Sequence, residues 1–153
     1  MKTITFKTII LLLIATSCRP GRIHEEHRKM EHVAWKKHQD MTFEFEVEDV
    51  SASYDIFLAI RHATLYPFDN LLVSTVLTTP GGEKRYTDYD FAIKDKDGMF
   101  LGDGLGELWD INLPLRKGFT FSQPGTCRIE LENRMLKRIT PGIVEIGLIV
   151  EKN

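Results

Sequence analysis

The sequence is poor in cysteine and has no excess of basic residues. It contains two cysteines, too few for the disulfide network that holds small secreted scaffolds together. Lys2 and Lys7 are the only charged side chains before residue 18, so the rest of the chain has 18 basic and 22 acidic side chains, a formal charge of −4. Nucleic acids are bound by basic surfaces, so this mildly acidic balance argues against a nucleic-acid partner.

Long apolar runs are also scarce, and the one that is present lies close to the start of the chain. Residues 9–15 read IILLLIA, follow two lysines and lead into the small residues Ala15, Thr16 and Ser17. The run is shorter than the roughly 20 apolar residues that cross a bilayer, and it lacks the polar face of a helix at a domain surface. A basic start, an apolar centre and small residues predict a secretory signal peptide over residues 1–17.

Cys18 follows the small residues at once, and this arrangement resembles the lipobox of bacterial lipoproteins. In that class of signal the leader is cut before the cysteine, the thiol is acylated, and the new amino terminus is acylated too. We therefore predict a lipid anchor at Cys18 that tethers the protein to a membrane without spanning it. The alternative is an ordinary signal peptide beside which a cysteine occurs by chance.

Residues 18–40 are highly charged and hold four of the five histidines. We expect this segment to be a polar, lipid-anchored tether, with Trp35 docking on the folded domain where the tether ends. His24 and His27 lie in the tetrapeptide HEEH, which is one residue short of the HExxH zinc motif. Because the spacing is wrong and no third ligand is identifiable, we predict no metal site.

From residue 41 onward, apolar residues recur with a period of two. The segment TFEFEV alternates Phe43, Phe45 and Val47 with glutamates, the pattern of a half-buried antiparallel strand. Further β-rich runs occur at 54–62, 70–79, 87–93, 99–115, 119–125, 126–132 and 144–151. The run at 70–79 is apolar on both faces, which favours a central strand. Only residues 132–139 suggest a short helical turn. We predict an all-β domain over residues 41–153, an antiparallel two-sheet sandwich of jelly-roll type.

Residues with catalytic potential form no recognisable set. Cys127 alternates with charged neighbours, so we expect a buried thiol that shares a face with Ile129 and Leu131. The glycines of GDGLG, residues 102–106, lack the spacing of a dinucleotide loop, and the nearby acids do not complete a calcium loop. A loop that uses glycine conformations is the expected structure. We predict neither a catalytic residue nor a cofactor.

The connection YPFDNL, residues 66–71, offers the best candidates for contact with another molecule. Pro67, Asp69 and Asn70 are turn formers, so the segment should link two strands. Tyr66 and Phe68 either cap the core or contact a protein or a sugar. We take Tyr66, Phe68 and Trp109 as candidate partner or ligand contacts, and burial of all three would weaken a sugar-binding role.

Taken in order, these features resemble the gliding-motility lipoprotein family GldH of the Bacteroidota. The likeness extends over roughly residues 33–151. Its most specific pieces are R-x-x-x-x-Y-P-x-x-N-L, from Arg61 to Leu71, and L-G-x-G-L-G, from Leu101 to Gly106. Arg134 and Met135 stand where the family tends to show the reverse order, so no role is carried over to that arginine.

The resemblance implies a non-enzymatic envelope lipoprotein associated with the gliding and type IX secretion machinery, with other envelope proteins as its partners. Arg19 follows the cysteine without an acidic surface-export signal, so we expect the periplasmic face of the outer membrane. The alternative hypotheses are a carbohydrate- or ligand-binding sandwich lipoprotein and a hydrolase. Fold alone does not decide among them.

Overall fold

The structure, a computed structural model, describes residues 21–153. The predicted signal peptide and Cys18 lie outside this range. The described chain forms eleven strands and one 3₁₀ turn: β1 (Arg22–Lys29), η1 (Glu31–Val33), β2 (Ala34–Lys36), β3 (Met41–Val47), β4 (Tyr54–Ala63), β5 (Asn70–Thr78), β6 (Lys84–Ala92), β7 (Asp103–Leu105), β8 (Leu108–Phe119), β9 (Gly125–Asn133), β10 (Ile139–Pro141) and β11 (Ile143–Lys152). None of the helical structure in this range is long and apolar enough to cross a membrane.

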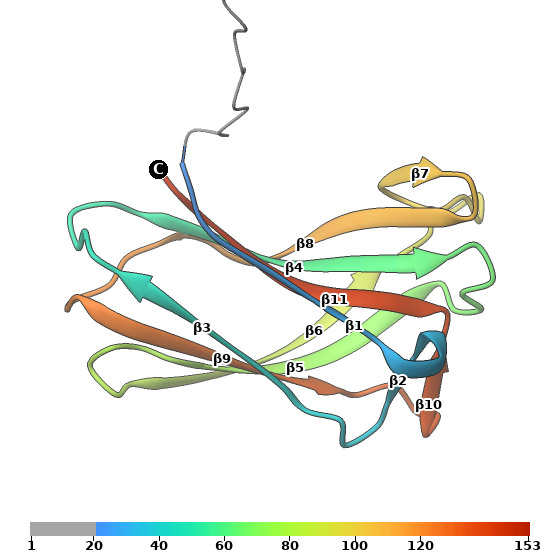
Figure 1. Ribbon diagram of the computed structural model, residues 1–153, viewed down its shortest axis with the longest axis horizontal. Helices are drawn as coiled ribbons and strands as arrows, with labels where there is room; N and C mark the ends of the chain where they lie inside the picture. The colour runs from blue at the N-terminus through green and yellow to red at the C-terminus, as the bar shows by residue number, and fades with distance from the viewer. Residues whose placement is uncertain (1–20) are drawn as a thin grey trace, which may run out of the picture.

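The strands form two antiparallel sheets packed face to face (Figure 1). One sheet has the order β1-β11-β4-β8-β7, the other has the order β3-β9-β5-β6, and β2 pairs with β10 at one end of the molecule. With the three-residue strands set aside, the first sheet contains strands one, eight, three and six of the chain. The second sheet contains strands two, seven, four and five. This is the jelly-roll order, so the predicted sandwich of jelly-roll type is confirmed.

The core between the sheets is built from the apolar member of each alternating pair. On β3, Phe43, Phe45 and Val47 are at most 3 % exposed, while the intervening glutamates face water. Burying one such side chain fully contributes about 1.5–3 kcal/mol to stability. β5 lies between β9 and β6, as its apolar sequence predicts.

The two long sides of the sandwich are closed differently. Between β6 and β8, the Arg116 guanidinium donates to the Thr87 hydroxyl (2.6 Å) and the Leu115 carbonyl (2.8 Å), and it also contacts the Tyr89 hydroxyl. On the other side, polar side chains of β1 lie over aromatic rings of β3. The Arg28 guanidinium, for example, lies 4.5 Å from the ring centroid of Phe43. The β1–β3 side keeps a groove that is described below.

The prediction of a tether over residues 18–40 is wrong for residues 22–40. β1 is an edge strand paired with β11, and Trp35 on β2 is fully buried, with its indole N–H donating to the Gln39 carbonyl at 2.8 Å. The sequence of β1 reads as polar because both of its faces carry charged or histidine side chains: one face is solvated, and the other covers the edge of the core. The folded domain therefore begins about twenty residues earlier than expected.

Two further expectations differ in detail. Residues 132–139 form no helical turn, because the Asn133 side chain organises an irregular connection there. Its amide donates to the Trp35 carbonyl (3.0 Å) and the Thr140 hydroxyl (2.9 Å), and its oxygen accepts from the Met135 N–H. The run at 99–115 is not one strand but the β7–β8 hairpin.

The sandwich has two distinct ends (Figure 1). We call one the entry end: Gly21 and Asn153 lie there, with the connections at 48–53, 79–83 and 120–124. We call the other the loop end: it carries residues 30–40, 63–69, 93–107 and 134–142. β1 runs from the entry end to the loop end.

Candidate protein-binding site

The two motifs that carry the family resemblance meet at the loop end. The connection at 63–69 follows β4, and it is held against the β7–β8 hairpin because the Thr64 N–H and hydroxyl both donate to the Glu107 carbonyl, at 2.8 and 3.1 Å. The Lys94 ammonium pairs with Asp69 at 3.1 Å on the other side of this connection. Residues 63–69 thus lie at the centre of the loop end.

Arg61 fixes the strands that lead into this end. Its guanidinium donates two hydrogen bonds to the Asp110 carboxylate, at 2.8 and 2.9 Å, and a third to Glu145 at 3.3 Å. The hydrogen bond and charge of Asp110, together with Glu145, raise the pKa of Arg61 further. Arg61 therefore bridges β8, β4 and β11 on the outer face of the sheet. Within residues 21–153, Arg134 pairs only with the half-exposed Glu132, at 3.3 Å.

Tyr66 belongs to the core and cannot be a partner contact. It is 2 % exposed, its hydroxyl donates to the Asn70 carbonyl at 2.9 Å, and burial raises the pKa of its phenol. Gly142 packs so closely on its backbone that a Cβ would lie 2.8 Å from the Tyr66 Cα. The expectation that Tyr66 contacts a ligand is therefore wrong, and its alternative role as a core cap fits the structure.

Phe68 and Trp109 are half-buried at the rim of the loop end. The Phe68 ring meets Tyr66 edge to face at 5.6 Å, and the Lys137 ammonium lies 5.8 Å from its centroid. Trp109 packs against Phe100 at 5.5 Å and against Gly104, where an added Cβ would lie 3.0 Å from the indole. Both side chains are partly exposed, and a contact role for them stays a prediction.

His62 lies beneath the loop end in an aromatic environment. Its ring centroid is 4.7 Å from that of Phe100 and 5.4 Å from that of Tyr66, and the side chain is fully buried. Nδ1 lies 3.1 Å from the Ala63 carbonyl, while Nε2 has no hydrogen-bond partner within residues 21–153. Desolvation lowers the pKa of this imidazole. His62 is therefore neutral at physiological pH.

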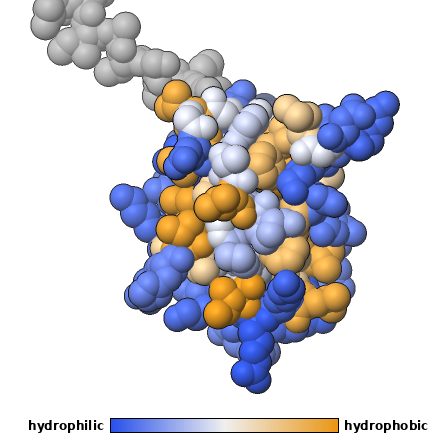
Figure 2. Space-filling model, turned by 90° about the vertical axis from the view of Figure 1, so that its right-hand side faces the viewer, coloured by the Kyte–Doolittle hydropathy of each residue, from blue (hydrophilic) through white to orange (hydrophobic). Residues whose placement is uncertain are grey.

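Exposed apolar side chains gather at the loop end, and sequence reasoning missed them. Of the eleven large apolar residues exposed in the described chain, eight lie here: Val33, Leu65, Met99, Leu101, Leu105, Leu108, Leu136 and Ile139. Leu65, Leu105 and Leu136 are 87–92 % exposed. Figure 2 views this end and shows hydrophobic side chains spread across it among hydrophilic ones. Exposed apolar side chains concentrated at one end make the loop end the candidate binding surface.

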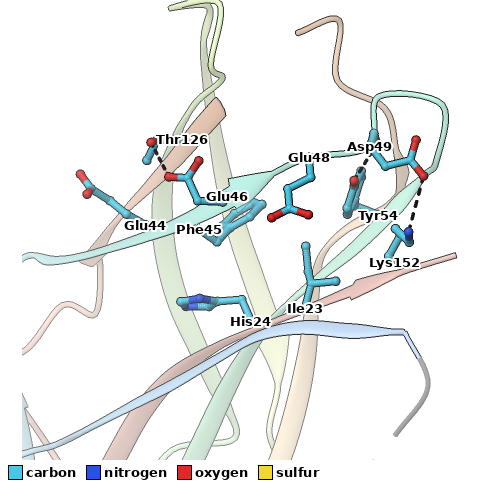
Figure 3. A pocket seen from close by; sticks show the side chains of 10 residues that line it. All are labelled: Ile23, His24, Glu44, Phe45, Glu46, Glu48, Asp49, Tyr54, Thr126 and Lys152. Carbon is cyan, nitrogen blue, oxygen red and sulfur yellow. Dashed lines mark hydrogen bonds and ion pairs between the residues drawn. The ribbon is translucent and has the colours of Figure 1, made fainter. Parts of the chain in front are cut away.

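A hollow of about 600 Å³ opens between β1 and β3 toward the entry end (Figure 3). Glu44 and Glu46 of β3 and Glu48 just after it line one side of the hollow, and Ile23 and His24 of β1 line the other. Burial lowers the pKa of His24, whose nearest carboxylate oxygen, on Glu26, lies 3.9 Å away. The aromatic rings of this groove, Phe45 and Tyr54, are at most 3 % exposed and offer no open face to a sugar.

The cysteine and histidine side chains discussed in the sequence analysis do not come together within residues 21–153. Cys127 is buried on β9 with Ile129 and Leu131, as predicted, and burial raises the pKa of its thiol to about 12. His62 lies on the opposite sheet. His24 and His27 sit three apart on a strand, so they point to opposite faces. No group of three or more His, Cys, Asp or Glu side chains within residues 21–153 is arranged to hold a metal ion.

Fold and site together define a small jelly-roll protein whose exposed apolar surface is concentrated at one end. The sequence model of the GldH lipoprotein family matches residues 22–150 of this chain, so the chain belongs to that family. It is thus an envelope lipoprotein of a family whose named members are gliding-motility lipoproteins.

Two curated relatives support this. The gliding motility lipoprotein GldH homolog of Christiangramia forsetii is 24 % identical over 155 residues, covering 97 % of this chain and 94 % of the relative. The gliding motility lipoprotein GldH of Flavobacterium johnsoniae is 26 % identical over 151 residues, covering 94 % of each. Among solved structures, the VP2 subviral particle of infectious bursal disease virus matches with a TM-score of 0.36 and 13 % identity, over 84 % of this chain and 32 % of that one. A TM-score this low supports no conclusion about function.

Proposed function

We propose that this protein is a lipid-anchored, non-enzymatic component that binds other envelope proteins of the gliding and secretion machinery through its loop end. The observation that carries the proposal is the gathering of eight exposed apolar side chains around residues 63–69. The burial of Cys127 and His62 and the pairing of Arg61 with carboxylates support a binding role over a catalytic one. The anchor is Cys18, and the periplasmic face of the outer membrane is the proposed location.

The binding role is tested by cross-linking cells that express the full-length lipoprotein and purifying it under denaturing conditions. Replacing Leu65 and Leu136 by Glu places charge in the apolar surface and should abolish recovery of envelope partners. The matched control replaces Tyr86 and Val50, which are also exposed but lie on β6 and at the entry end. Equal recovery from both double variants would count against a binding role for the loop end.

The anchor is tested separately. Cys18→Ala should remove labelling by radioactive palmitate and shift the protein out of the membrane fraction. The reason is that Cys18 is the residue proposed to carry the acyl chains that hold the protein at the membrane. Palmitate incorporation that persists in Cys18→Ala would contradict the assignment.

A further inference from the structure

Two segments of opposite net charge flank the exposed apolar surface. On the side of the β7–β8 hairpin, residues 95–110 contain five acidic side chains and one lysine, all exposed. Asp110 is taken up by Arg61, but no ion pair within residues 21–153 engages the carboxylates of Asp95, Asp97, Asp103 or Glu107. The hairpin side of the loop end is therefore an acidic half.

The opposite side of the loop end is a basic half. Residues 134–138 read RMLKR, with three basic side chains and no acid. The Lys37 N–H donates to the Arg138 carbonyl at 2.8 Å, which brings Lys36 and Lys37 of the preceding segment beside them. Within the described chain, Lys137 and Arg138 form no ion pair with a carboxylate. Leu65 lies between the two halves, with Leu105 and Leu108 on the acidic side and Leu136 and Ile139 on the basic side.

The course of β1 sets the direction that this surface faces. The described chain starts at the entry end, only three residues after Cys18, and three extended residues reach at most about 11 Å. β1 has eight residues and crosses to the loop end, a distance of about 26 Å at 3.3 Å per residue. The proposed anchor therefore holds the entry end next to the bilayer and turns the loop end away from it.

We infer that the loop end docks a second, different envelope protein on the side away from the anchoring membrane, through an apolar centre flanked by a basic patch and an acidic patch on the partner. The partner's basic patch faces the hairpin half and its acidic patch faces residues 134–138, because complementary charges across an interface fix its register. The membrane itself is excluded as the occupant by the position of the anchor. Two copies joined loop end to loop end would direct their anchors in opposite directions, which one bilayer does not allow. This inference rests on the binding role proposed above.

The test places a photo-activated cross-linking amino acid in the full-length lipoprotein in cells, at Leu105 or Leu136 in separate strains, with Tyr86 as the matched control position. Cross-linked peptides are then identified by mass spectrometry. We expect both positions to capture the same envelope protein, with the Leu105 probe joined to a basic segment of it and the Leu136 probe joined to an acidic one. Lys137→Glu with Arg138→Glu should reduce the Leu136 cross-link several-fold and leave the protein folded, since both side chains are exposed and neither forms an ion pair in the described chain.

The possible results separate the two proposals. If neither position yields a cross-linked protein above the Tyr86 control, the binding role and this inference both fail. A single captured protein whose cross-linked segments lack the opposite charges, or a Leu136 cross-link indifferent to charge reversal, overturns the inference and leaves the binding role standing. A cross-link to a second copy of the chain overturns it as well.

Discussion

At the scale of single residues, the buried His62 lies beneath the loop end in an aromatic environment. Desolvation lowers the pKa of His62 in the folded state below its usual value of 6.5, opposed by the Ala63 carbonyl and the Asp110 charge and assisted by Lys94. Between the folded-state pKa and 6.5, the His62 imidazole therefore binds more protons in the unfolded chain than in the folded one. Stability contributed by the neutral imidazole is fully present above pH 6.5 and is lost as the pH falls toward the folded-state pKa.

We expect the free energy of unfolding to fall between pH 7 and pH 5, and the slope to be smaller in His62→Phe. Denaturant titrations of both proteins at several pH values measure it. His24 retains its own contribution in the variant, since its pKa is also lowered by burial. A His62→Phe variant with an unchanged slope would show that His62 is not the responsible group.

The glycine at position 102 permits a close backbone approach in the β7–β8 hairpin. Its φ is +92°, and a Cβ there would overlap the Asp110 carbonyl oxygen. Gly98 has a similar φ of +79° but open space around it. We expect Gly102→Ala to destabilise the protein by about 3 kcal/mol through strain and overlap, and Gly98→Ala by about 1 kcal/mol through strain alone. Thermal unfolding of the two variants decides this, and equal losses would contradict it.

At the scale of elements, β1 shows why part of the fold was hidden in the sequence. In β3 and β11, apolar residues mark the buried face, and both strands were predicted. In β1, the face toward the core carries His24, Glu26 and Arg28, of which His24 lies against Phe45 and Arg28 over Phe43. A pattern of alternating hydrophobicity cannot reveal such a strand, because the strand that holds it by hydrogen bonds, β11, is more than a hundred residues away.

Hydrogen exchange tests β1 directly in the intact lipoprotein. Alternate amides between His24 and Lys29 should exchange slowly, at rates comparable with those of the edge strand β6, because they donate to β11. Segment 95–98, an exposed turn, provides the fast reference. Exchange at the rates of an unfolded chain throughout residues 22–29 would contradict the pairing of β1 and support the tether that the sequence predicts.

The candidate site could be predicted only in outline. The motifs from Arg61 to Leu71 and from Leu101 to Gly106 mark two segments of the loop end, and Phe68 and Trp109 lie in it. The exposed leucines escaped notice because each is isolated among turn residues, as in TLYP and GLGE. Their proximity arises from the jelly-roll connections, which bring four distant segments to one end. For Tyr66 the sequence leaves a core cap and a ligand contact both open, because no local signal distinguishes a capping aromatic from an exposed one.

At the scale of the whole molecule, the short distance between Cys18 and β1 predicts a fixed orientation. A fluorophore on Val50→Cys, at the entry end, should be quenched by lipids carrying a quencher when the intact lipoprotein is reconstituted in vesicles. The same fluorophore on Leu65→Cys should not, since about 26 Å separate the ends. Labelling is selective because Cys127 is buried and its thiol pKa is raised to about 12. Stronger quenching at position 65 would reverse the orientation.

The pairing of β1 with β11 also bears on how the protein matures. The last long strand lies between the first and the third, so neither can complete its hydrogen bonding until residues 143–152 are available. In a chain that emerges amino terminus first, β1 therefore stays without its hydrogen-bonding partner until β11 has emerged. Loss of the final ten residues would thus leave β1 and β4 without the strand that joins them. The larger sheet would stay incomplete, and its unpaired strands would be exposed to quality-control proteases close to the lipid attachment point.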